Sequence, residues 1–325
     1  ITKDDGTIQL IERRLKLPTT PSEKAELLFS LGKAHDDCGE YDLAFKNLEA
    51  GNLIQSKSMP DVTGNIISTS DRIRDIFLAL KDNFSSVKYE NEQKKPIFIV
   101  GMPRSSSTLV EQIISNHSAA FPLGETTIIE NIFQSLRWGS IPTSNSNLKL
   151  INDLYYKYVG EVDGSKDFIT DKSLSNYLYV GFLLLAFPNA KIIHSKRDAR
   201  ATAWSIYKLQ FGNKNVPYSY NLKDIIRVYK NQVSLMNFWE EHFPGKIFNL
   251  NYNNLTHNIE AEAKKIMEFC EISWEADCLK FDKNERSVNT ASSAQVRQSI
   301  YTGSENDWRN YETHLKDVFK ELDGY

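Results

Sequence analysis

The chain has 325 residues, of which 41% are hydrophobic, and a net charge of −3. A chain of this size can bury a large core and form one large or two ordinary domains. Its acidic balance argues against a general nucleic-acid binder, so any bound phosphate would have to be met by local basic residues.

The N-terminal residues 1–90 are predicted to be all-helical. From Pro21 to Ser58, apolar residues recur with the helical period on both sides of a turn. Several residues stand where a tetratricopeptide helix pair has them: Leu31, Gly32, Gly39, Tyr41 and Ala44. One pair cannot bury its own faces, so either Ile8–Leu17 and a helix over 71–82 cap it, or further repeats precede it. A generic helical hairpin explains the pattern equally well.

A further helical run connects this segment to the rest of the chain. The pattern from Asn65 to Ser86 is helical, and we expect Ser70 to cap its N-terminus. The chain would then divide into a helical segment, 1–90, and a second domain, 91–325.

The segment from Lys95 to Ile114 carries the strongest functional signal. Pro96 to Val100 is an apolar, β-branched run typical of a buried parallel strand. A tight turn, four consecutive hydroxyl residues from Ser105 to Thr108, and a helical run follow. A strand, a hydroxyl-rich loop and a helix N-terminus form an anion cradle, in which backbone N–H groups, hydroxyls and Arg104 can surround a phosphate.

This loop differs from that of nucleoside triphosphatases. Their pattern, GxxxxGK[ST], requires a second Gly and a Lys, but Ser106 and Ser107 stand at those positions. No strand ending in a magnesium-binding Asp stands out either. A nucleotide-dependent kinase is therefore disfavoured, and a serine-capped β–α turn with no ligand remains the plain structural alternative.

A second strand and helix follow later in the chain. Ala190 to His194 is expected to form a buried strand that ends at Lys196-Arg197-Asp198, and Ala199 to Tyr207 has helical composition. Open α/β sheets bind ligands where strand ends lead into helices. We therefore expect an α/β fold, with a P-loop-like parallel sheet flanked by helices.

Together these motifs resemble the sulfotransferase superfamily. PRSSST at 103–108, Gly124-Glu125, FPNAK at 187–191 and KRDARATAWS at 196–205 carry the likeness, which covers about Lys95 to His314. It is strongest to tyrosylprotein sulfotransferases and to bacterial sulfotransferases with tetratricopeptide repeats. The resemblance implies transfer of a sulfuryl group from 3′-phosphoadenosine 5′-phosphosulfate (PAPS) to an acceptor hydroxyl, leaving 3′-phosphoadenosine 5′-phosphate (PAP).

The resemblance also implies residues that hold the donor. The 5′-phosphosulfate loop falls on five residues: Arg104, Ser105, Ser106, Ser107 and Thr108. Ser106 replaces the usual Gly, so we expect no Gly-only conformation there. Arg197 and, eight residues later, Ser205 would grip the 3′-phosphate, and a guanidinium can bind it in bidentate fashion.

The resemblance implies three more cofactor contacts. Tyr252 lies 55 residues after Arg197, as does a family tyrosine near the cofactor, although it could equally close a strand at the edge of the core. Arg297 and Tyr301 lie in a stretch that resembles the loop over the adenosine phosphates.

The catalytic residues that the resemblance implies are Glu125, Lys172 and Ser292. Glu125 lies 21 residues beyond Arg104, the spacing of the family's base, and a buried carboxylate there would remove the acceptor's proton. Lys172 and Ser292 would stabilise charge on the transferred and leaving groups. A strand over the residues FIT, just before Lys172, would place that lysine at the site. A surface Glu in a loop and a lone surface Lys are the alternatives.

The sequence leaves the acceptor and the partners open. A protein tyrosine, a glycan or a small molecule would each supply the hydroxyl, and the helical segment could bind a protein partner. No metal spacing such as HExxH or CxxC appears, so we expect no metal site. A rival interpretation is a helical-repeat interaction protein whose nucleotide-binding domain is inactive.

Three features of the sequence bear on localisation. The three cysteines fit a reducing compartment better than a disulfide framework. No apolar stretch reaches the ~18 residues of a membrane span. No signal peptide is visible, although the initial Ile suggests a fragment. We expect a cytoplasmic protein with no nucleic-acid partner.

Overall fold

The computed structural model describes residue 2 and residues 6–83, 94–136, 144–160, 166–211, 216–281 and 302–325. These residues pack into two units. Unit 1 comprises residues 1–68, 198–231 and 303–325, and unit 2 comprises residues 69–197 and 232–302.

Unit 2 is built on a five-stranded parallel sheet of strand order β2-β3-β1-β4-β5. The strands are β1 (Lys95–Gly101), β2 (Ala120–Gly124), β3 (Phe168–Asp171), β4 (Lys191–Lys196) and β5 (Ile247–Asn251). The buried parallel strands expected at 96–100 and 190–194 are confirmed as β1 and β4. Their continuous apolar runs follow from burial of both sheet faces.

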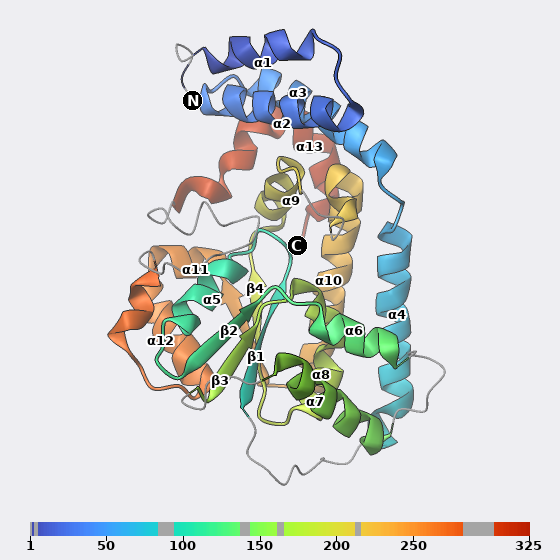
Figure 1. The fold of residues 1–325 in the computed structure, drawn as a ribbon, viewed down its shortest axis with the longest axis vertical. Coiled ribbons are helices and arrows are strands. Elements are labelled where there is room, and N and C mark those ends of the chain that lie inside the picture. Colours follow the sequence, from blue (N-terminus) through green and yellow to red (C-terminus); the bar gives the residue numbers. More distant parts are fainter. Residues whose placement is uncertain are drawn as a thin grey trace. The chain divides into compact units, whose positions relative to one another are not determined.

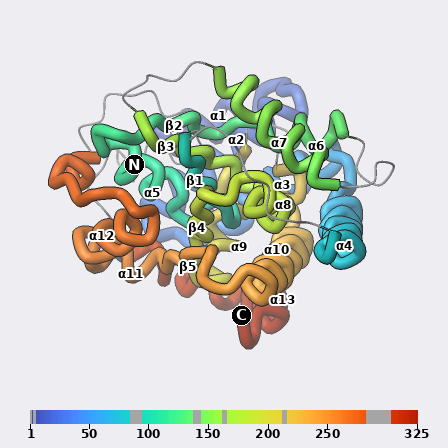
Figure 2. Tube along the Cα trace, turned by 90° about the horizontal axis from the view of Figure 1, so that it is seen from below, coloured from blue at the N-terminus to red at the C-terminus, as the bar shows by residue number. Residues whose placement is uncertain are grey.

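Helices cover both faces of this sheet (Figures 1 and 2). One face packs against α6 (Ile128–Ser135), α7 (Asn145–Val159), α8 (Val180–Ala186) and the later parts of α4 (Thr63–Leu80) and α10 (Leu222–His242). The other face packs against α5 (Ser107–Ser115), α11 (Tyr252–His257) and α12 (Ile259–Cys270). The expected α/β fold with a parallel sheet flanked by helices is therefore confirmed.

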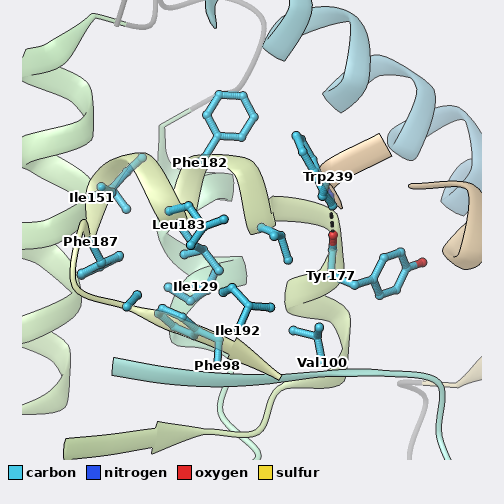
Figure 3. Close-up of a cluster of buried hydrophobic side chains, with 14 of the residues drawn as sticks. Phe98, Val100, Ile129, Ile151, Tyr177, Phe182, Leu183, Phe187, Ile192 and Trp239 are labelled. Atoms are coloured by element: carbon cyan, nitrogen blue, oxygen red, sulfur yellow. Dashed lines mark hydrogen bonds between the residues drawn. The ribbon is translucent and has the colours of Figure 1, made fainter. Parts of the chain in front are cut away.

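Alternation along β1 divides the core between the two faces. Phe98 and Val100 point to the α8 side, where Phe182 and Trp239 pack above them (Figure 3). Ile97 and Ile99 belong to the cluster on the opposite face, because successive side chains of a strand point to opposite sides. The Trp239 indole donates a hydrogen bond to the Tyr177 carbonyl at 2.9 Å, which satisfies its only polar group.

Unit 1 is helical. It contains α1 (Thr7–Leu15), α2 (Pro21–Asp37), α3 (Tyr41–Ser58), α9 (Ala199–Tyr207) and α13 (Glu312–Phe319), with the first parts of α4 and α10. α1, α2 and α3 lie side by side (Figure 1). α2 and α3 approach closely, since a Cβ on Gly32 would lie 2.7 Å from the Leu48 Cγ. The all-helical N-terminal segment is confirmed.

The hairpin of α2 and α3 is covered by later parts of the chain. Phe45 on α3 stacks on Trp204 of α9 and on His314 of α13. Asn52 donates a hydrogen bond to the Tyr207 carbonyl at 3.0 Å. α1 packs on α2 as expected, whereas Ile73 and Phe77 of α4 are buried in the core of unit 2.

The cap expected at Ser70 is wrong. α4 begins at Thr63, and Ser70 lies in its interior with no exposed surface. Its side chain hydrogen-bonds Tyr177 in the core of unit 2. The sequence gives no sign of this role, because the pairing of Ser70 with Tyr177 is a tertiary contact.

Short 3-10 helices complete the fold. They are Lys81–Asn83, Leu174–Tyr179, Pro217–Tyr220, Ala276–Leu279, Thr302–Glu305, Asp307–Tyr311 and Lys320–Leu322.

Candidate active site

The loop between β1 and α5 lies at the carboxyl edge of the sheet. β1 ends at Gly101, whose φ of 148° is one that glycine favours. A Cβ there would lie 2.5 Å from the Ser195 carbonyl oxygen of β4, so only glycine lets the two strands approach. The expected strand, loop and helix N-terminus are thus in place.

Two loop residues adopt left-handed backbone. φ is 70° at Arg104 and 79° at Ser106. Ser106 has a left-handed backbone, which glycine favours but which serine can also adopt, so the expectation of no Gly-only conformation there stands. A serine there carries strain of about 1 kcal/mol or more.

Buried hydroxyls hold the loop in this shape. The Ser105 hydroxyl donates to the Met102 carbonyl at 2.7 Å, and the Ser195 hydroxyl donates to the Ser105 carbonyl. Ser105 is 1% exposed, so its donor is used inside the loop. Ser107 and Thr108 lie in the first turn of α5 and are also buried.

The N-terminus of α5 is open to an anion. Ser106 is its N-cap residue and makes no side-chain capping bond in the part of the chain that the structure describes. The first turn of α5 carries no acidic residue. Its first N–H groups and the positive end of its dipole are therefore directed at the loop.

Two guanidinium groups stand beside this helix end. Arg197 donates a hydrogen bond from Nη1 to the Arg104 carbonyl at 3.1 Å and lies over the Tyr252 ring at 4.6 Å from its centroid. Burial, followed by the nearby Arg197 charge, lowers the pKa of Arg104 to about 10, while Tyr252 acts in the opposite direction. Like charges held together in a partly buried site attract an anion that neutralises both.

Glu125 and Lys172 meet at the ends of neighbouring strands. β2 and β3 pair in parallel up to Gly124 and Asp171, and the Lys172 N–H extends the ladder to the Gly124 carbonyl at 3.1 Å. The Lys172 Nζ lies 2.6 Å from the Glu125 Oε1. The Lys172 side chain is fully buried at 0% exposure, whereas that of Glu125 is 44% exposed. Lys172 thus follows a strand, as expected, but the carboxylate is more exposed than the buried base that we expected.

Two buried carboxylates near this pair were missed by the sequence analysis. Asp171 has no exposed surface, and Glu111 on α5 is 8% exposed. Burial raises the pKa of Asp171 to about 6, hydrogen bonds from Ser173 and Thr126 oppose this, and Glu111 adds to it. A signal was present in both cases, since each is an acidic residue inside an apolar run: ITD for Asp171 and LVEQII for Glu111.

The structure does not test the other predicted site residues. Ser205 lies buried on α9, within unit 1, so its contribution to the donor site stays a prediction. Ser292, Arg297 and Tyr301 lie outside the described residues.

No group of three His, Cys, Asp or Glu side chains among the described residues is placed to hold a metal ion. None of the described helices is long and apolar enough to cross a membrane.

Comparison with known proteins identifies the family. The profile of the sulfotransferase family matches residues 96–276, more than half of the chain. The chain belongs to the sulfotransferase family.

Its relatives include two proteins of known sequence and one of known structure. A protein of Aquifex aeolicus (strain VF5) whose function is uncharacterised is 32% identical over 98% of this chain, which spans only 44% of that protein's length. A Caenorhabditis briggsae protein named "Putative protein-tyrosine sulfotransferase" is 24% identical over 70% of this chain and 84% of its own. The sulfotransferase domain of the Synechococcus PCC 7002 olefin synthase shares the fold at 16% identity, with a TM-score of 0.52 over 69% of this chain and 91% of that domain.

Proposed function

We propose that the chain is a PAPS-dependent sulfotransferase that transfers a sulfuryl group to an acceptor hydroxyl. This proposal rests on the carboxyl edge of the sheet, where a cationic site and a Glu–Lys pair lie after different strands. An open helix end with two guanidinium groups lies after β1 and β4, and a Glu–Lys pair lies after β2 and β3. The family match favours sulfuryl transfer over other uses of such an edge.

The cationic side would hold the donor's phosphates. The α5 N–H groups and Arg104 suit the 5′-phosphosulfate, and Arg197 suits the 3′-phosphate. Tyr252, packed under the Arg197 guanidinium, would keep that side chain in place. Ser205, Arg297 and Tyr301 would complete the site.

The chemical step would be an in-line displacement. The acceptor oxygen forms a new bond to sulfur as the bond between sulfur and the donor's phosphate oxygen breaks, leaving PAP. The acceptor's proton passes to Glu125, and Lys172 with Ser292 stabilises the negative charge that grows on the phosphate oxygen. No metal ion is required in this scheme.

The Glu125–Lys172 contact fits these two roles. The pair neutralises itself in the structure, with the ammonium 2.6 Å from the carboxylate. A bound donor brings several negative charges, which compete with Glu125 for the ammonium. Movement of Lys172 toward the donor would free the Glu125 carboxylate to accept a proton.

We propose that α2 and α3 are a tetratricopeptide-like pair, because Gly32 and Gly51 permit close packing against Leu48 and Phe29. This pair would contribute to binding a protein partner.

The three cysteines are free, which supports a reducing, cytoplasmic setting. The acceptor's class, whether a protein tyrosine, a glycan or a small molecule, stays open.

Two substitutions separate binding from chemistry. Glu125→Ala should keep PAP affinity within about threefold and reduce turnover at least a hundredfold, since general bases contribute roughly 10²–10⁴ in rate. Arg197→Ala should weaken PAP binding about a hundredfold, or roughly 2.7 kcal/mol. The assays are calorimetric titration with PAP and transfer of ³⁵S from PAPS to phenol, glycan and tyrosine-peptide acceptors.

Matched controls are Glu130→Ala on α6 and Lys264→Ala on α12, which remove surface charges of the same signs. Equal loss of PAP binding in Glu125→Ala and Arg197→Ala would overturn the role of Glu125 as a base.

A further inference from the structure

The mechanism leaves two buried carboxylates without a task. Asp171 and Glu111 lie close to the Glu125–Lys172 pair, with 0% and 8% of their surfaces exposed. Burying such groups costs several kcal/mol unless hydrogen bonds offset it. The bonds that each of them accepts therefore indicate what it does.

Asp171 ties the turn after β2 to the turn after β3. Its Oδ1 accepts from the Ser173 N–H at 3.1 Å and from the Asn176 amide at 3.2 Å. Its Oδ2 accepts from the Thr126 hydroxyl at 3.3 Å. Ser173 also joins the two turns, since its hydroxyl accepts from the Thr126 N–H at 3.0 Å and donates to the Thr126 carbonyl. These bonds fix the residue that directly follows Glu125.

Glu111 fixes the residue that directly precedes Glu125. Its Oε1 accepts from the Gly124 N–H at 3.0 Å and from the Thr170 hydroxyl at 3.3 Å. Glu111 lies on the second turn of α5, and the first turn of the same helix borders the cationic loop. One side chain thus links the helix of the proposed donor site to the turn that carries the proposed base.

We propose that Glu111, through Gly124, and Asp171, through Thr126, are positioning residues that hold Glu125 at a fixed place relative to the donor loop. This inference rests on the proposed function. The strand ladder alone supplies one bond beyond Asp171, from the Lys172 N–H to the Gly124 carbonyl. A catalytic group must be held to within about 0.5 Å, and a 1 Å displacement can cost about a hundredfold in rate.

Paired substitutions test the role. Thr126→Val removes the hydroxyl that bonds Asp171 with little change of shape, and Thr126→Ser keeps it. Glu111→Met removes both acceptor bonds, and Glu111→Gln keeps an acceptor oxygen. We expect kcat to fall at least tenfold in Thr126→Val and Glu111→Met, with PAP affinity within threefold of wild type. Thr126→Ser and Glu111→Gln should recover most of the rate.

The control is Glu262→Met, which removes another buried carboxylate of unit 2, on α12. The Glu262→Met variant should have an unchanged kcat, even if its thermal stability falls as far as that of Glu111→Met. Thr126 is only half-buried, so its variants keep the test valid if Glu111→Met does not fold. Unchanged kcat in Thr126→Val would overturn the proposal.

A second readout does not depend on activity. Hydrogen exchange of the backbone over residues 120–127 should be at least tenfold faster in Glu111→Met and Thr126→Val, with no change over residues 97–101. Addition of PAP should slow exchange over 120–127 in wild type and not in Glu111→Met. Wild-type protein that fails to bind PAP would defeat the proposed function, whereas unaltered exchange in both variants would defeat the positioning role alone.

Discussion

The two halves of the carboxyl edge of the sheet differ in charge and in hydrogen bonding. After β1 and β4, the loop carries two left-handed residues and two neighbouring guanidinium groups, and the helix end beside them has no side-chain cap. After β2 and β3, the turns are joined by a dense set of hydrogen bonds, and the buried ammonium of Lys172 already has a carboxylate partner. The first half carries backbone strain and also a repulsion between two cations, which an anion would relieve. In the second half, the side chains of the two turns bond to one another.

One edge of the sheet can therefore serve both binding and chemistry. Repulsion between cations makes the donor side bind anions more tightly, because a bound phosphate removes the repulsion. Internal hydrogen bonds make the other side rigid, which suits a proton acceptor that must be accurately placed. Substitutions on the two halves should therefore have different signatures.

The largest expected effect is on the donor half, from Gly101→Ala. The new Cβ would meet the Ser195 carbonyl at 2.5 Å, and the backbone at φ 148° disfavours any side chain. Strain and overpacking together should lower the free energy of unfolding by about 3 kcal/mol or more. Urea denaturation measures the change.

Gly64→Ala is the control, since a Cβ there has no atom within 4 Å. It should alter stability by less than about 1 kcal/mol. A small loss in Gly101→Ala would show that β1 and β4 do not need their close approach.

A pH-dependent effect is expected on the other half, from Asp171→Asn. Burial raises the pKa of Asp171 from 3.8 to about 6 in the folded protein, so the folded state holds this proton more tightly than the unfolded state. Ionising Asp171 between pH 4 and pH 7 therefore destabilises wild type by on the order of 3 kcal/mol. Relative to wild type, Asp171→Asn should become more stable by up to about that amount as the pH rises over this range.

The difference between the two proteins at pH 4 is the reference for this experiment. His194, whose pKa burial lowers to about 4, titrates in both proteins and cancels in the difference. A difference that stays constant from pH 4 to pH 7 would contradict the conclusion that burial destabilises the ionised Asp171 carboxylate.

The smallest expected effect returns to the donor loop, with Ser106→Gly. Glycine relieves the strain at φ 79°, while its greater freedom in the unfolded chain offsets part of the gain. The net change should be a stabilisation of less than about 1 kcal/mol, with PAP affinity within threefold of wild type. Chemical denaturation and calorimetry give the two quantities.

Glu271→Gly is the matched control, because Glu271 also has a positive φ, of 58°, at the end of α12. Abolished PAP binding in Ser106→Gly would mean that the serine side chain itself holds the ligand.

Most of the sheet could be predicted from the sequence, because buried parallel strands leave continuous apolar runs. β1, β4 and the helix α9 correspond closely to the segments that these patterns predict. The contact of Glu125 with Lys172 could not be predicted from apolar patterns, since it depends on the register of β2 against β3. It was anticipated only in part, through the family spacing of the two residues.

The hydrogen bonds around Glu125 and the packing of the N-terminal helices depend on contacts between residues distant in the chain, which no local pattern encodes. Asp171 and Thr126 are 45 residues apart in the chain, and Glu111 and Gly124 are 13 apart. The packing of α9 and α13 against the N-terminal helices joins residues more than 150 positions apart. The left-handed backbone at Ser106 was missed because a serine there gives no sign of the conformation.

The proposed donor site is tested most directly by calorimetric titration of the wild-type protein with PAP in metal-free buffer, with ATP as the comparison ligand. We predict a micromolar dissociation constant for PAP, little binding of ATP, and loss of PAP binding in Arg197→Ala. No binding of PAP, or a preference for ATP with magnesium, would contradict this prediction.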